Sequence, residues 1–269
     1  MVKAIRVHEL GGPEVLKWED VEIGEPGEGE IRVRNKAFGV NFIDIYFRTG
    51  VYEAATMPFT PGVAMEVGDI MAYAGNPMNS EEQILPAIPV PSSISLGIAA
   101  SVILKGMTTQ FLLRHCFKVE GGHIILVHAA AGLREGGVVG EGEDVMVGVG
   151  SLLCQWANAL GATVIRTVST KEEAAQAKDD GCHHVIIYEE EDFVACINEI
   201  TSSNGVDVLY NSAGKDTFQG SLTCLKLRGY MVSFGQSSGT PDPVSLSALA
   251  PKSLFLTRPF SRAIHNNSG

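Results

Sequence analysis

The sequence predicts an α/β protein in which a β-rich part precedes a doubly wound parallel sheet. Three observations support this prediction. Glycine accounts for 30 of 269 residues, about 11% against a usual share of about 7%, as in the tight turns of α/β proteins. Short β-like runs broken by Gly- and Pro-rich clusters fill residues 1–100. From about residue 99, apolar strands alternate with amphipathic helices, which is the pattern of βαβ units.

The first 100 residues are predicted to form a β-dominated domain. Its β-like runs include residues 2–10 and 30–40, and its turn clusters include GGP, GEPGEGE, TPG and PVPSS. Residues 99–117 carry apolar side chains at helical spacing. We therefore expect a crossover helix and linker at 101–122, between two domains of modest size.

Residues 123–259 are predicted to form the parallel sheet, followed by a polar tail at 260–269. Strands are expected at 123–130, 162–169, 183–188, 206–213, 229–235 and 253–258. Helices are expected at 151–161, 171–181, 190–202 and 215–229. Several of these helices end on the glycine that is common just beyond a helix C-terminus. Such sheets bind ligands outside the carboxyl ends of their strands.

The charge balance disfavours nucleic acid and anionic lipid as partners. Twenty Lys and Arg against 31 Asp and Glu give a net charge of −11. The N-terminus does not have the pattern of a secretion signal, and no stretch approaches the roughly 20 apolar residues of a membrane span. We therefore expect a cytoplasmic protein.

Cysteine and histidine usage predicts neither disulfides nor a metal site. The five cysteines lack CxxC or Cys/His ligand spacing, so free, mostly buried thiols are favoured over reactive ones. No cysteine precedes Cys116, and the N-terminal half offers only His8, so a tetrahedral catalytic zinc site is not expected. His128 lies in an apolar strand and is interpreted as a core residue.

A dinucleotide site requires a strand that runs into a glycine turn and then a helix. Here the strand ends at Gly132 and the helix begins at Ser151, and residues 133–147 read as an insertion. Joining Gly132 to Gly148 would restore a compact strand, turn and helix. Four carboxylates in the insertion would repel a pyrophosphate. The alternative is a surface loop, with Gly148, Val149 and Gly150 still capping the helix.

The end of the second strand bears on the choice of cofactor. It carries polar or basic residues before any acid: Arg166, Ser169, Thr170 and Lys171. This order favours a 2′-phosphate, and hence NADPH, over the acidic residue that selects NAD. An ordinary helix N-cap at Ser169 or Thr170 is a compatible interpretation. Glu172 and Glu173 in the same turn weaken the argument for a phosphate.

The chain carries four motifs that together give it a family resemblance. In order, they lie at 39–52, at 104–113, at HAAAG together with 148–162, and at 232–239. They resemble the NADPH-dependent quinone oxidoreductases, the zeta-crystallin-like, zinc-free branch of the medium-chain dehydrogenase/reductase superfamily. The resemblance covers residues 1 to about 259. It implies a GroES-like β-domain before a Rossmann-type domain, NADPH in the cleft between them, direct hydride transfer to a quinone, and a homodimer joined through the sheet edge.

The resemblance also assigns residues to the cofactor and acceptor sites. The nicotinamide and quinone pocket would be lined by Asn41 and Tyr46, with Thr108 contacting the cofactor. The pyrophosphate would lie against Gly132, Gly148, Val149 and Gly150. The 2′-phosphate would lie near Ser169, Thr170, Lys171 and Tyr188. The far end of the dinucleotide would be walled by Ser212, Phe234, Gly235, Gln236 and Ser237.

Structural roles are the alternative for several of these residues. Tyr46 and Phe234 would only pack, Asn41 would cap a turn, and Thr108 would begin a helix. No proton donor is assigned, because the cofactor carries the chemistry of quinone reduction.

The chain departs from the family pattern at several places. Arg166 stands where relatives have a glycine, Glu173 where a phosphate-binding lysine is expected, and Asn211 where an aspartate is usual. The resemblance also implies that residues 60–75 are shorter than in the family and that the C-terminal segment returning to the first domain is missing.

The function expected from these observations is NADPH-dependent quinone reduction, impaired if the insertion disturbs the site. An alkenal or enone double-bond reductase is a neighbouring alternative, because it uses the same hydride geometry. A non-catalytic splice or gene-model variant, inactive or acting through dimer formation, is an alternative of another class. RNA binding is disfavoured by the acidic balance.

Overall fold

The structure is a computed structural model that describes residues 2–22, 24–25, 28, 41–54, 56–61, 64–65, 71–74, 88–129 and 148–259. The described residues divide into two compact units, of which the first ends at Leu104 and the second begins at Lys105. The expected strand at 30–40, Gly132, the insertion at 133–147 and the tail at 260–269 lie outside the described residues.

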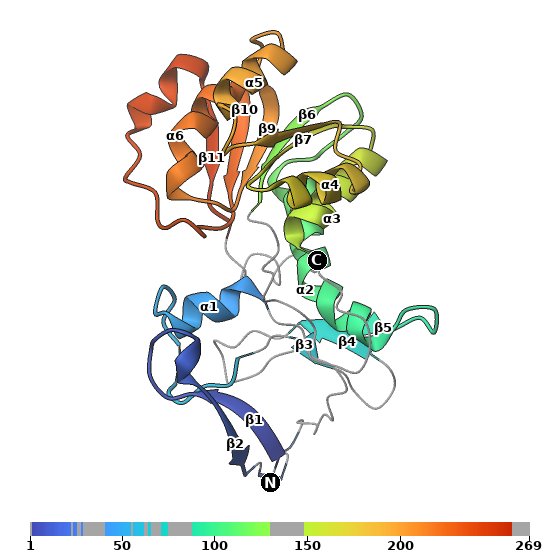
Figure 1. The fold of residues 1–269 in the computed structure, drawn as a ribbon, viewed down its shortest axis with the longest axis vertical. Helices are drawn as coiled ribbons and strands as arrows, with labels where there is room; N and C mark the ends of the chain where they lie inside the picture. Colours follow the sequence, from blue (N-terminus) through green and yellow to red (C-terminus); the bar gives the residue numbers. More distant parts are fainter. Residues whose placement is uncertain are drawn as a thin grey trace. The chain divides into compact units, whose positions relative to one another are not determined.

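The first unit is built mainly from short antiparallel strands (Figure 1). β1 (Val2–Val7) pairs along its full length with β2 (Leu16–Val21), and a 3-10 turn lies between them at Pro13–Val15. A second sheet contains β3 (Ala64–Met65), β4 (Met71–Ala74) and β5 (Ile88–Pro89). The helix α1 (Phe42–Arg48) follows Asn41. The β-rich first part is therefore as predicted.

A long helix begins in the first unit and ends in the second. α2 (Leu96–Phe111) starts five residues before the predicted 101 and continues as a π-helical turn, Leu112–Cys116. By length and composition alone, these 21 residues could cross a membrane, a test that the buried core helices of globular proteins also pass. Leu112 and Leu113 are buried in the core of the second unit. The packing of this end of the helix accounts for part of its apolar character.

The second unit is a six-stranded parallel sheet with the order β11-β10-β9-β6-β7-β8. Its strands are β6 (Ile124–His128), β7 (Thr163–Val168), β8 (His184–Ile187), β9 (Val206–Asn211), β10 (Leu225–Ser233) and β11 (Phe255–Thr257). Counted from the first strand, the order is 3-2-1-4-5-6, which is the Rossmann topology. The predicted doubly wound sheet is confirmed, and its topological switch point lies between β6 and β9.

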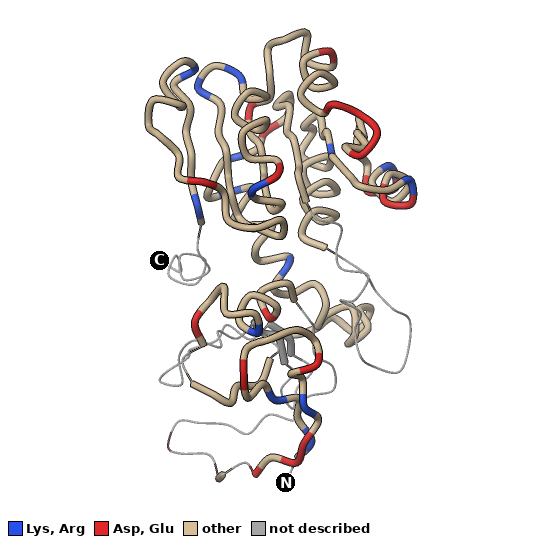
Figure 2. Tube along the Cα trace, turned by 60° about the vertical axis from the view of Figure 1, so that its left-hand side comes forward, with Lys and Arg blue, Asp and Glu red and all other residues tan. Residues whose placement is uncertain are grey.

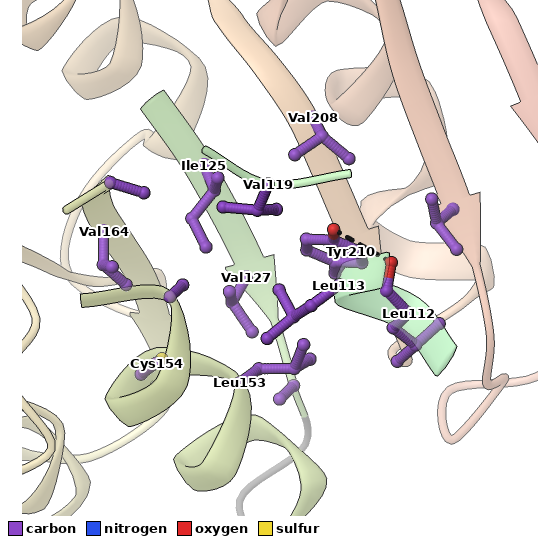
Figure 3. Close-up of a cluster of buried hydrophobic side chains, with 14 residues drawn as sticks. Leu112, Leu113, Val119, Ile125, Val127, Leu153, Cys154, Val164, Val208 and Tyr210 are labelled. Atoms are coloured by element: carbon purple, nitrogen blue, oxygen red, sulfur yellow. Dashed lines mark hydrogen bonds between the residues drawn. The ribbon is translucent and has the colours of Figure 1, made fainter. Parts of the chain in front are cut away.

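Helices cover both faces of this sheet (Figure 1). They are α3 (Val149–Ala159), α4 (Lys171–Asp179), α5 (Phe193–Ile200) and α6 (Lys215–Cys224). Side chains of β6 alternate between two cores, as expected for a buried parallel strand. Ile125 and Val127 join the cluster that packs α3 and the π-helical turn after α2 on the sheet, shown in Figure 3, while Leu126 joins the cluster beneath α5 and α6.

Two predicted boundaries differ from the structure. The helix expected at 215–229 ends at Cys224, because Leu225 is fully buried and already pairs with Val206 in the sheet. The strand register then shifts before Tyr230, and Arg228 adopts a left-handed conformation with φ 60°. At the glycine turn, α3 begins at Val149 rather than at Ser151.

His128, at the carboxyl end of β6, is a core residue as predicted. Its Nδ1 lies 2.6 Å from Thr167 Oγ1 on the neighbouring strand, and its ring packs edge-on against Phe193. Its Nε2 is buried without a hydrogen-bond partner among the described residues. Burial lowers the pKa of His128 from 6.5 to about 3. The imidazole is therefore neutral in the folded protein at neutral pH.

This burial predicts a pH-dependent stability. Between pH 3 and 6.5 the unfolded chain binds a proton at His128 that the folded chain does not, so stability falls as the pH drops through this range. We expect His128 to account for a loss of about 2 kcal/mol between pH 6.5 and 5. Urea unfolding should show that His128→Gln loses less stability than the wild type between these two pH values, by about this amount. The exposed His184→Gln should behave as the wild type, and equal losses in all three proteins would contradict this role of His128.

Candidate functional site

The carboxyl ends of β6, β9 and β10 lie side by side at the switch point of the sheet. At such a point the neighbouring connections leave toward opposite faces, which opens a crevice for a ligand. The residues that follow these three strands are Ala129, Ser212 and Phe234. The second unit therefore has its candidate site at the start of α3 and in the loops after β9 and β10.

The first turn of α3 is pressed against the end of β6. Gly148 is the N-cap in an extended conformation, and Val149 and Gly150 form the start of the helix. A Cβ on Gly150 would lie 2.3 Å from the Cβ of Ala129, so a larger residue does not fit. Only glycine allows this approach of helix and strand, which is the packing role of a glycine in dinucleotide-binding turns. The first N–H groups of an α-helix have no partner within the helix, so the start of a helix binds an anion favourably.

The loops after β9 and β10 are joined to each other and to β6. The Ser212 amide donates to the carbonyl of His128 at 2.8 Å, and the Ser237 amide donates to the carbonyl of Ser212 at 3.0 Å. A Cβ on Gly235 would lie 2.8 Å from Ser212 atoms, so glycine is required here as well. Phe234 packs against the core. The structure thus brings together the residues predicted for the far end of the dinucleotide.

Asn211 organises this part of the site, a role that the sequence did not indicate. Its side chain is fully buried, and its Nδ2 donates to Thr217 Oγ1 at 2.9 Å and to Ser221 Oγ at 3.2 Å. Its Oδ1 accepts from the Gly214 amide at 2.8 Å. An amide can donate and accept at once, whereas an ionised aspartate only accepts. The replacement of the usual aspartate is therefore matched by its surroundings.

Arg258 was also missed, because it belongs to no motif. It follows β11, and its Nη1 donates to the Gly235 carbonyl at 3.0 Å while its Nη2 donates to Gln236 Oε1 at 3.1 Å. A guanidinium presents several donors in a fixed plane, so one side chain can hold two neighbouring acceptors. Arg258 thereby fixes the loop that carries Gly235, Gln236 and Ser237.

Arg166 does not project toward a cofactor as the sequence argument assumed. It is 4% exposed, and its Nη1 lies 2.8 Å from Asp180 Oδ2. Asp180 also accepts from Gln155 at 2.8 Å and from the hydroxyl of Ser151 in α3. A buried charge is stable when it is paired and hydrogen-bonded, which explains why an arginine in an apolar strand faces this aspartate. The pair connects β7 with the ends of α3 and α4.

Residues that were predicted to lie near a 2′-phosphate instead form the N-terminal cap of the helix α4. Thr170 is the N-cap, and its hydroxyl accepts from the Glu173 amide at 3.2 Å. The Glu173 carboxylate in turn accepts from the amide and the hydroxyl of Ser169, each at 2.8 Å. Lys171 lies 3.4 Å from Glu190 in an exposed ion pair, and Tyr188 is exposed. The interpretation of this segment as a helix cap is therefore correct, and Glu173 is part of the cap.

The candidates from the first unit lie on or near α1. Asn41 is its N-cap and forms a capping box with Asp44, in which the backbone N–H of Asn41 donates to Asp44 Oδ2 at 2.9 Å. Tyr46 packs edge-on against Phe42 and Tyr52. The structural interpretation of Asn41 as a cap is thus correct. Thr108, in contrast, belongs to the second unit, lies well inside α2 and does not begin a helix.

Gly150 and Gly235 let the start of α3 and the loop after β10 pack closely on Ala129 and Ser212, and the first of these contacts is the packing that a dinucleotide-binding turn requires. The second unit does not offer free Ser169 donors for a 2′-phosphate, since Glu173 takes them. All five cysteines are free, as predicted. Among the described residues, no group of three or more His, Cys, Asp or Glu is placed to hold a metal ion.

Comparisons with known proteins give one consistent result. A family model described as zinc-binding dehydrogenase matches residues 148–265. The chain is 41% identical to a 2-haloacrylate reductase of Burkholderia, with 96% of this chain and 81% of the relative covered. It is also 41% identical to a quinone oxidoreductase of Pseudomonas aeruginosa over the same shares. The crystal structure of Escherichia coli quinone oxidoreductase complexed with NADPH superposes with a TM-score of 0.84 at 38% identity, covering 96% of this chain and 81% of that one.

The contact between α3 and β6 predicts the effect of a single methyl group. Gly150→Ala should destabilise the protein by about 1–3 kcal/mol, because the added Cβ forces the helix away from Ala129. Urea unfolding measures this loss. The matched control is Gly106→Ala in α2, where an added Cβ meets nothing within 4 Å and which should gain about 0.5–1 kcal/mol. Equal stabilities for the two variants would show that the contact is not tight.

Proposed function

Because the chain belongs to the quinone oxidoreductase family of the medium-chain dehydrogenase/reductases, we propose that it transfers hydride from NADPH to a quinone. The observation that carries this proposal is the close packing of Gly150 on β6, which places a helix N-terminus at the switch point of a Rossmann sheet. The oxidoreductase class follows from the family, and NADPH is the cofactor in the solved relative.

Residues of the second unit, within the proposed nucleotide-binding domain 123–259, would hold the cofactor. The amides at the start of α3 would bind the pyrophosphate through Gly148, Val149 and Gly150, together with Gly132 outside the described residues. The loops held by Asn211 and Arg258 would line the other end of the dinucleotide through Ser212, Phe234, Gly235, Gln236 and Ser237. Ser169, Thr170, Lys171 and Tyr188 would lie nearest the adenosine ribose.

Two candidates for contacts with the nicotinamide and the acceptor lie in the first unit. We assign Asn41 and Tyr46 to the nicotinamide and quinone, and Thr108 to a cofactor contact, within a GroES-like domain at 1–100 and the following helix. The bound cofactor supplies the hydride, so the protein needs to position the acceptor and exclude competing reactions. The capping box fixes Asn41, and two neighbouring rings restrict Tyr46.

A double-bond reductase is the second candidate. The 41% identity to a 2-haloacrylate reductase favours it, because the substrate in that relative's name is an α,β-unsaturated acid. Both reactions transfer a hydride to a conjugated, electron-poor acceptor.

The remaining parts of the proposal are a cytoplasmic, zinc-independent enzyme and a homodimer joined at the sheet edge formed by β11, where Phe255 is exposed.

Turnover assays separate these functions. NADPH oxidation by the purified full chain is followed with a para-quinone, with 2-chloroacrylate and without an acceptor. We expect the highest kcat/KM with the quinone and no oxidation without an acceptor. Faster reduction of 2-chloroacrylate would instead support the double-bond reductase. Tight NADPH binding without turnover on either acceptor would contradict both activities and support the non-catalytic alternative.

A further inference from the structure

The end of β7 carries an anion that belongs to the protein itself. Ser169 directs both of its hydrogen-bond donors, the backbone amide and the hydroxyl, to the same oxygen, Glu173 Oε2, at 2.8 Å each. The Glu173 amide is bound in turn by Thr170 Oγ1. Both donors of Ser169 are therefore taken by a negatively charged group from the first turn of α4.

This carboxylate lies where the proposed function places the adenosine ribose of the cofactor. In a Rossmann sheet, the end of the second strand meets the adenosine ribose, and β7 is the second strand here. A 2′-phosphate binds through donors and positive charge. A carboxylate uses the same donors and repels a phosphate at short range. Glu173 and a 2′-phosphate therefore compete for Ser169.

The nearby basic residues offset this competition little. Arg166 is buried and paired with Asp180 on the inner side of the strand. Lys171 is exposed and lies 3.4 Å from Glu190. Figure 2 shows acidic residues gathered on the loop after β8, which contains Glu189, Glu190, Glu191 and Asp192. Ser169 and Lys171 thus each contact a carboxylate of the protein, Glu173 and Glu190 respectively.

We propose that Glu173 is a specificity-determining residue that lowers the selection of NADPH over NADH. The inference rests on the proposed function, since it concerns the same cofactor site. NADPH must displace the Glu173 carboxylate and break two charge-assisted hydrogen bonds, whereas NADH, which has a 2′-hydroxyl, leaves the helix cap intact. The affinities of the wild-type chain for the two cofactors consequently differ by less than about tenfold.

Calorimetric titration of the full chain with NADPH and NADH tests this proposal. Glu173→Gln removes the charge but keeps an oxygen that can accept from Ser169, so the helix cap is retained. We expect it to bind NADPH about tenfold more tightly and NADH within about twofold of the wild type. Glu173→Lys, which adds a cation, should extend the preference for NADPH further. Glu172→Gln removes a charge from the same helical turn without freeing Ser169, and should change the NADPH to NADH ratio by less than about threefold.

The outcomes distinguish this inference from the proposed function. A wild-type preference for NADPH above about a hundredfold that Glu173→Gln leaves unchanged would overturn the role of Glu173 while the proposed function stands. If Glu172→Gln and Glu173→Gln changed the NADPH to NADH affinity ratio equally, the change would come from the net charge of the helical turn and not from the contact with Ser169. That result would also overturn the role of Glu173. Binding of neither dinucleotide to any of the four proteins would overturn the proposed function and this inference together. Thermal unfolding of each variant verifies that it is folded.

Discussion

The candidate site depends on the contact between the first turn of α3 and the end of β6. Gly150 allows the helix to begin against Ala129, and this places the helix N-terminus at the switch point of the sheet. Asp180 holds the same turn from the other side, because it accepts from Ser151 of α3 and from Arg166 of β7. One buried carboxylate thereby ties β7 and the end of α4 to the start of α3.

In the loops after β9 and β10, the candidate site is held by side chains that hydrogen-bond neighbouring backbone segments together. Asn211 joins the end of β9 to the start of α6, and Arg258 joins the end of β11 to the loop after β10. These groups hold backbone segments in place before any ligand arrives, which is what a dinucleotide site requires. The exception is the end of β7, where Glu173 and not a ligand occupies the donors of Ser169. At this strand end, the donors of Ser169 are therefore held by the protein itself and not left for a phosphate.

Much of this arrangement could be predicted from the sequence, because alternation of strand and helix determines a parallel sheet. The helix expected at 215–229 was too long, since its last residues, LKLRG, alternate in a way that suits either element and only the pairing of Leu225 with Val206 decides. Arg166 was misjudged because its partner, Asp180, lies 14 residues away. An arginine inside an otherwise apolar strand was a signal that a buried partner exists. Arg258 gave no signal, since its role depends on where β11 joins the sheet.

Hydrogen exchange of backbone amides tests the central claim most directly, namely that the start of α3 binds the dinucleotide. Saturating NADPH or NADH should slow exchange at residues 148–151, at the start of α3, and at residues 235–237, in the loop after β10. Amides on the exposed side of α4, such as those near Lys178, should be unaffected and serve as an internal reference. Unchanged exchange at 148–151 in the presence of a bound dinucleotide would contradict the account.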